Sequence, residues 1–176
     1  MKRLKLVLKA VVESRASAIG KLLLPGEAVV IERGVPRWIL IKCPCGCGEE
    51  IPINVDARSG KAWRLYRDNR SGITLYPSVW RDTGCESHFI VWRGQINLFG
   101  SSADDERPPM ENAEVSALAE RVLHVWPKNG LAPYLPIADQ LGEIPWDILE
   151  ACRWLVRKGI LVEGLGRDRG SFRRRV

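Results

Sequence analysis

The sequence lacks any apolar run close to the length of a membrane-spanning helix. Such a helix needs about 20 predominantly apolar residues, and charged residues interrupt every apolar stretch of this 176-residue chain. Residues 1–9 resemble a signal peptide only in being basic, because lysines break their apolar part and no small-residue cleavage site follows. We therefore expect a protein without membrane contact that works in the cytoplasm.

The sequence also lacks a uniform charge, although its formal net charge is +6. Residues 1–103 carry 16 Lys and Arg against 9 Asp and Glu, whereas residues 104–166 carry 6 against 11. The end of the chain is basic again through Arg167, Arg169, Arg173, Arg174 and Arg175. This distribution disfavours a nucleic-acid-binding surface along the whole chain and leaves Arg167 to Arg175 as the candidate segment for such contact.

Two kinds of apolar spacing lie on either side of residues 100–112, a segment of Gly, Ser, Pro and acidic residues that is typical of a linker. Before it, short β-branched and aromatic runs separated by turn residues predict a mostly antiparallel β domain over residues 1–103. The expected strands are 5–12, 28–32, 37–42, 51–55, 62–66, 73–76, 88–92 and 95–99. Over residues 113–176, three stretches of helical spacing followed by two short strands around a Gly/Arg loop give the outline of a winged helix. The predicted fold class is therefore α+β, with an N-terminal zinc-containing β domain and a C-terminal winged-helix-like domain.

The cysteines are clustered in a way that favours a metal over disulfides. Cys43, Cys45 and Cys47 lie within five residues, and Cys85 is followed three residues later by His88. In a chain without an export signal such spacing indicates a zinc site, and Gly46 and Gly48 allow the tight turns that it needs. Zinc takes four thiolate or imidazole ligands, so five candidates leave two sets open: Cys43, Cys45, Cys47 and Cys85, or three thiols with His88. The first set is preferred, because it spares His88 for chemistry and makes the metal a structural one. A catalytic metal and a cluster without metal are the alternatives.

The stretch from Trp38 to Phe99 carries motifs that resemble a family of small bacterial proteins. They are Cys-Pro-Cys-Gly-Cys-Gly over residues 43–48, the pair Pro77-Ser78 at the end of a strand, and Cys-Glu-Ser-His over residues 85–88, followed by a Gly-bearing hairpin. Members of that family are similar to proteins encoded beside bacterial ubiquitin-like modifiers, and their proposed role is that of a peptidase. The resemblance covers about a third of the chain and implies nothing for the C-terminal domain.

The resemblance implies that Ser78 and His88 are catalytic. A serine hydroxyl is a weak nucleophile unless a positioned base accepts its proton, and His88 is the only histidine among residues 1–103. Ordinary turn chemistry for Ser78 and zinc ligation for His88 remain the alternatives. The carboxylate that would orient the imidazole stays open among Glu49, Glu50, Asp82 and Glu86. Ser87 is a further nucleophile candidate, although a residue next to His88 in a strand faces the opposite side.

Four tryptophans of the β domain, Trp38, Trp63, Trp80 and Trp92, are expected in the core or at sheet edges. An exposed subset of them would line a groove for an extended peptide tail.

Two functions from different classes follow. The first is a serine-type peptidase with a structural zinc that processes or removes a bacterial ubiquitin-like modifier, with that modifier, its conjugates and conjugating enzymes as partners. The alternative is a non-enzymatic, zinc-bearing winged-helix adaptor or DNA-binding regulator. The third helix carries acidic residues and tryptophans rather than a basic surface, so the C-terminal domain is assigned to protein contact, with nucleic-acid binding through Arg167 to Arg175 as the alternative.

Overall fold

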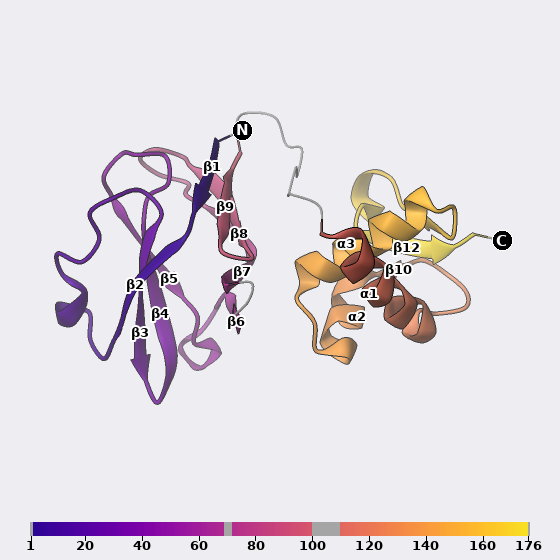
Figure 1. The fold of residues 1–176 in the computed structure, drawn as a ribbon, viewed down its shortest axis with the longest axis horizontal. Helices are drawn as coiled ribbons and strands as arrows, with labels where there is room; N and C mark the ends of the chain where they lie inside the picture. Colours follow the sequence, from indigo (N-terminus) through magenta and orange to yellow (C-terminus); the bar gives the residue numbers. More distant parts are fainter. Residues whose placement is uncertain (1, 69–71, 100–109, 176) are drawn as a thin grey trace. The chain divides into compact units, whose positions relative to one another are not determined.

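The computed structural model describes residues 2–68, 72–99 and 110–175, and the chain divides into two compact units, Met1–Arg107 (unit 1) and Pro108–Val176 (unit 2) (Figure 1). The linker predicted over residues 100–112 lies outside the described residues except for its last three. Within the described ranges, no helix combines the length and the apolar character that crossing a bilayer requires.

Unit 1 contains two sheets, which Figure 1 shows as separate layers. The five-stranded sheet has the order β1-β9-β8-β7-β6 and the four-stranded sheet the order β2-β3-β4-β5. All their strand pairs are antiparallel except β2 with β3, so the predicted mostly antiparallel β domain is confirmed. The strands are β1 Lys2–Lys5, β2 Val7–Val12, β3 Glu27–Arg33, β4 Val35–Lys42, β5 Glu50–Asn54, β6 Arg64–Asp68, β7 Gly72–Trp80, β8 His88–Trp92 and β9 Gln95–Leu98.

The core of unit 1 lies between the two sheets. Alternate side chains of each strand point inward, as the period of a half-buried strand requires, and the inner positions are aliphatic or aromatic. The largest of them, Ile39, Ile41 and Ile53 from one sheet and Leu75, Phe89 and Ile96 from the other, are at most 2% exposed.

The first predicted strand, 5–12, is in fact two strands that belong to different sheets. Leu6, at the crossing point, is buried in the core. Its main-chain N–H donates to the Gly94 carbonyl, whereas the N–H of Val7 donates to the Gly26 carbonyl. The chain therefore passes from one sheet to the other at Leu6, a change of partner that an uninterrupted apolar run does not signal.

The strand that carries Ser78 is longer than predicted. β7 runs through the Pro77-Ser78 pair to Trp80, and its register against β8 shifts between Leu75 and Val79. The Tyr76-Pro77 peptide bond in this interval is cis, and proline has no N–H to give to a sheet ladder. Ser78 therefore belongs to a bulge within a strand, which corrects the expectation that the Pro-Ser pair ends one.

Unit 2 consists of three helices and a three-stranded antiparallel sheet of order β10-β12-β11. The helices are α1 Asn112–Val125, α2 Tyr134–Leu141 and α3 Pro145–Arg157, and the strands are β10 Ala132–Pro133, β11 Leu161–Glu163 and β12 Ser171–Arg174. The apolar stripe of α1 is buried through Val115, Leu118, Ala119 and Val122. Together with the sheets of unit 1, these elements confirm the α+β class.

Candidate metal centre and serine–histidine cleft

The loop between β4 and β5 folds three cysteines into one tight turn. The Cys43 N–H donates to the Glu49 carbonyl at 2.8 Å, and the Gly46 N–H donates to the Cys43 carbonyl at 3.2 Å. Gly46 and Gly48 have φ angles of +95° and +85°, in the region that a side chain disfavours. The glycines thus allow the three thiols of the Cys-x-Cys-x-Cys sequence to turn toward one point.

Cys85, from the loop before β8, completes the group. The sulfur atoms of Cys43, Cys45, Cys47 and Cys85 all lie within 4.8 Å of one another. Cys43 Sγ is 3.2 Å from Cys45 Sγ and 3.6 Å from Cys85 Sγ, and none of the five cysteines forms a disulfide. These four cysteines are the set preferred from the sequence, and they lie close enough to hold a metal ion.

The donor set fits zinc. Four thiolates around a tetrahedral ion at about 2.3 Å lie about 3.8 Å from one another, and the two sulfur separations of 3.2 and 3.6 Å in this structure are somewhat shorter. Burial raises the pKa of the Cys43 thiol and raises that of Cys45 to about 12. Thiols with raised pKa values stay protonated at pH 7 without a cation, and a metal that binds them as thiolates would release their protons.

Ser87 contributes to this centre in a way that the sequence did not indicate. Its side chain is buried, and its Oγ lies 3.3 Å from Cys43 Sγ and 3.4 Å from Cys85 Sγ. Hydrogen bonding with Ser87 lowers the pKa of Cys85 to about 6. The hydroxyl has one proton to donate, so it can stabilise one of the two sulfurs as a thiolate at a time, and Ser87 is occupied at the cysteine cluster.

The cysteine cluster connects the two sheets of unit 1. Cys43 directly follows β4 of the four-stranded sheet, and Cys85 precedes β8 of the five-stranded sheet. An ion pair between Arg81 and Glu49 links the same two loops, and a 3.0 Å hydrogen bond from the Arg81 N–H to the Ser87 carbonyl closes the loop between β7 and β8. The cluster is therefore placed where a metal would hold the layers together at one end.

His88 is not a member of the cluster that the ligand atoms form in the described part of the chain. Its imidazole lies between aromatic rings, with centroids 4.7 Å from Phe99 and 6.1 Å from Trp80. Partial burial lowers the pKa of His88 below its ordinary value of 6.5. The imidazole is therefore neutral at pH 7 and able to accept a proton.

Ser78 and His88 line one cleft of about 400 Å³. Trp80 pairs with His88 across β7 and β8, and Ser78 lies two residues before Trp80, on the side of the strand away from the buried Val79. The Trp63 indole Nε1 donates to the Ser78 carbonyl at 3.2 Å and holds the bulge. The other lining residues are Lys61, Ala62, Trp63, Pro77 and Trp80. Within the described residues, no hydrogen bond joins the Ser78 hydroxyl to His88.

None of the four carboxylates considered from the sequence forms a hydrogen bond or ion pair with His88 in the described part of the chain. Glu49 is paired with Arg81, and Glu50 lies 4.0 Å from Lys42. Asp82 and Glu86 are exposed, the latter at a positive φ of 50°. Aromatic rings, rather than a carboxylate, hold the imidazole in this structure.

The tryptophans divide between core and clefts. Trp92 is buried, whereas Trp63 and Trp80 line the cleft of Ser78 and His88, with Trp80 71% exposed. The predicted exposed subset therefore exists. Lys61 was not singled out from the sequence, because nothing in its local pattern distinguishes it from other surface lysines.

Comparison with known proteins gives one result. No curated protein and no solved structure matches the chain. The model of a protein family does: residues 15–99, just under half of the chain, match the BubE family, described as bacterial ubiquitination-like system serine protease. These residues include Ser78, His88 and the four clustered cysteines. The resemblance indicated by the cysteine, Pro-Ser and Ser-His motifs is thereby confirmed, and residues 15–99 are similar in sequence to the BubE family of serine proteases.

Proposed function

We propose that unit 1 is a serine peptidase in which Ser78 is the nucleophile and His88 the general base, and that it processes or removes a ubiquitin-like modifier. The observation that carries this proposal is the shared cleft of Ser78 and His88 on neighbouring strands. The description of the matched family supports the peptidase class and the ubiquitination-like setting. The cytoplasm, where such a conjugation system would operate, is the proposed compartment.

The serines of the matched segment support the choice of Ser78. There are five, at positions 17, 59, 71, 78 and 87, and His88 is the only histidine there. Ser17 bonds to Ser14, Ser59 bonds to Asn54 and Asp56, and Ser87 contacts two sulfurs. Ser71 lies outside the described residues. Among the four described serines, Ser78 alone lines a cleft with the imidazole.

The proposed reaction is acyl transfer to the Ser78 hydroxyl. With a peptide in the cleft, neutral His88 accepts the Ser78 proton while Oγ attacks the scissile carbonyl carbon. The imidazolium then protonates the leaving amine as the carbon–nitrogen bond breaks, and water releases the acyl group by the reverse sequence of proton transfers. Trp63 and Trp80 offer flat apolar walls for an extended tail.

The proposed metal is a structural zinc held by Cys43, Cys45, Cys47 and Cys85. A closed four-thiolate site has no position for water or substrate, so the ion supplies folding energy rather than a nucleophile. It would fix the loop that ends at His88, three residues after Cys85. His88 remains outside the ligand set in this proposal.

The proposal is tested with a fluorophosphonate probe, which is attacked by an activated serine with loss of fluoride. We expect labelling of the zinc-loaded full chain at Ser78, located by mass spectrometry, and no labelling of Ser78→Ala. Ser17→Ala, at an exposed serine of the same unit, serves as the matched control. A modifier precursor with a C-terminal extension should be cleaved by the same variants that are labelled. Labelling of Ser78→Ala at an unchanged rate would contradict the assignment of the nucleophile.

For unit 2 we propose a winged-helix-like module that contacts a protein partner. The element order α1-β10-α2-α3-β11-β12 with an antiparallel sheet supports it. Within the basic segment, Arg174 is occupied in holding the end of α1, because its Nη2 donates to the carbonyl of Leu123 at 2.6 Å. The competing proposal, a DNA-binding regulator, requires salt-sensitive duplex binding that is lost when Arg167, Arg169, Arg173 and Arg175 are changed to Gln.

A further inference from the structure

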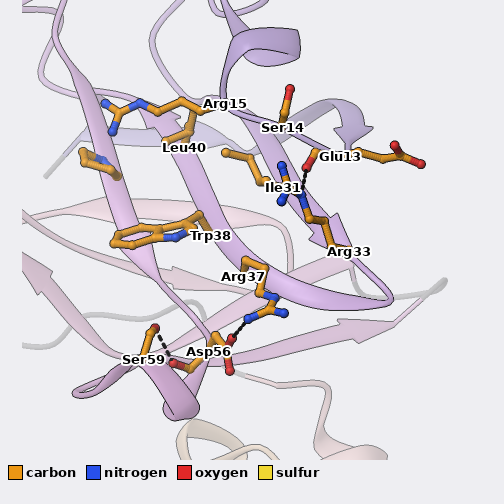
Figure 2. Close-up of a pocket in the computed structure, with 11 residues that line it drawn as sticks. Glu13, Ser14, Arg15, Ile31, Arg33, Arg37, Trp38, Leu40, Asp56 and Ser59 are labelled. Carbon is orange, nitrogen blue, oxygen red and sulfur yellow. Dashed lines mark hydrogen bonds and ion pairs between the residues drawn. The ribbon is translucent and has the colours of Figure 1, made fainter.

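A second cleft, of about 470 Å³, lies on the four-stranded sheet, on residues that the proposed chemistry does not use (Figure 2). We name it the Arg15–Trp38 cleft. Ile31, Trp38, Leu40 and Pro52 give it an apolar floor, and Glu13, Arg15, Arg33, Arg37 and Asp56 lie around that floor. None of these residues lines the cleft of Ser78 and His88.

The sheet register explains the floor. Ile31 pairs with Trp38 and Val29 pairs with Leu40, so these four side chains share the face of the sheet away from the main core. Ala18 and Leu22 cover part of that face and bury Val29, Ile31 and Leu40. The cover stops short of Trp38, which stays 39% exposed.

The charges around the floor are not balanced. Asp56 is buried and is bound by Arg58 Nε at 2.8 Å and by Arg37 Nη1 at 2.6 Å, and these guanidinium groups hold the pKa of Asp56 well below its usual range. Asp56 is therefore ionised, and its one negative charge is shared by Arg37 and Arg58.

The other two guanidinium groups have no counter-ion in the described part of the chain. The Nε–H of Arg33 donates a hydrogen bond to the main-chain carbonyl of Glu13 at 2.8 Å, and Arg33 forms no ion pair among the described residues. The Arg15 side chain forms neither a hydrogen bond nor an ion pair with the described residues. Figure 2 shows the Glu13 carboxylate turned away from Arg15 and from Trp38. Two cations thus stand beside an exposed aromatic ring and an apolar floor.

We propose that the Arg15–Trp38 cleft binds an extended acidic peptide segment of a protein partner. Two carboxylate side chains of the segment would contact Arg15 and Arg33, one each, since guanidinium and carboxylate groups form paired, charge-assisted hydrogen bonds. A neighbouring apolar side chain would cover Trp38 and Leu40. A nucleic acid fits less well, because only two guanidinium groups are left for a polyanionic backbone, which needs several phosphate contacts.

The test uses the zinc-loaded full chain and the peptide acetyl-Asp-Leu-Asp-Leu-amide, followed through the indole N–H resonance of Trp38. We expect saturable binding that is weakened about tenfold in the double variant Arg15→Gln, Arg33→Gln, as two lost exposed ion pairs imply. The double variant Lys5→Gln, Lys21→Gln removes the same charge at exposed positions of unit 1 outside the cleft and should bind as the parent does. The uncharged peptide acetyl-Asn-Leu-Asn-Leu-amide should bind the parent protein no more tightly than the acidic peptide binds the arginine double variant.

Three results would overturn the proposal. The first is that the indole resonance of Trp38 shows no saturable shift when the acidic peptide is added. The second is that the lysine double variant binds the peptide as weakly as the arginine double variant does. The third is that a 15-nucleotide oligo-dT binds more tightly than the peptide and displaces it. Because no variant touches Ser78 or His88, fluorophosphonate labelling should be the same in all of them. A failure here is therefore distinguishable from a failure of the proposed peptidase.

Discussion

The cysteine cluster and the Ser78–His88 cleft are neighbours in unit 1, yet they are held in different ways. The four thiols are brought together by a glycine turn, two main-chain hydrogen bonds and the buried hydroxyl of Ser87. Ser78 and His88 share a cleft through a strand bulge and aromatic contacts, without a direct hydrogen bond among the described residues. The cysteine cluster needs only a cation to complete it, whereas the hydrogen bond between Ser78 and His88 would have to form when a substrate binds. In the function that we propose, the cysteine cluster would be the support and the cleft would be the part that adjusts to a substrate.

Removal of one thiol should give the largest effect. Cys85→Ser takes away the ligand that connects the two sheets, so we expect zinc content to fall from one ion per chain to nearly none. The melting temperature of unit 1 should fall by about 10 °C or more, because a structural metal contributes its binding energy to folding. Elemental analysis and thermal unfolding measure the two quantities. Cys152→Ala, in α3, is the control and should keep its zinc; a Cys85→Ser protein with full zinc would exclude Cys85 as a ligand.

The next largest effect should come from a variant that lowers peptidase activity and leaves zinc binding unchanged. His88→Gln removes the proposed base while it keeps a polar side chain of similar size, and we expect kcat/KM for the modifier precursor to fall about a thousandfold with zinc content unchanged. His124→Gln, at the other histidine of the chain, provides the matched control. Loss of zinc in His88→Gln would instead make the imidazole a ligand.

Much of this contrast could be predicted from the sequence, because short-range patterns determine it. Cys-x-Cys-x-Cys with interleaved glycines requires one tight turn whatever surrounds it, and the strands around it follow from their β-branched runs. The bulge at residues 76–78 and the change of sheet at Leu6 depend on pairing with strands far along the chain, so local patterns do not reveal them. The place of Ser87 between two sulfurs and the two unpaired arginines of the Arg15–Trp38 cleft likewise arise from tertiary packing.

A smaller effect should test how the two regions are linked. Ser87→Ala removes the hydroxyl that contacts Cys43 and Cys85, and partners of this kind typically change metal affinity tenfold to a hundredfold. We expect zinc affinity about tenfold weaker, measured by competition with a chromogenic chelator, and activity within a factor of about three when zinc is saturating. Total loss of activity in zinc-loaded Ser87→Ala would move the nucleophile from Ser78 to Ser87.

The smallest expected effect lies in the pH dependence of the cleft. Burial lowers the pKa of His88 below 6.5, so the neutral base predominates at pH 7 to 8 and is lost as the pH falls through the lowered pKa. We therefore expect kcat/KM to be flat between pH 7 and 8 and to decline with a slope of one at a pH below 6.5. Zinc content, measured over the same range, should stay constant through that decline, because coordinated thiolates are protonated only when the metal leaves. If kcat/KM instead falls in parallel with zinc content, the acid sensitivity belongs to the cysteine cluster. The cluster and the cleft could then no longer be treated as separate in function.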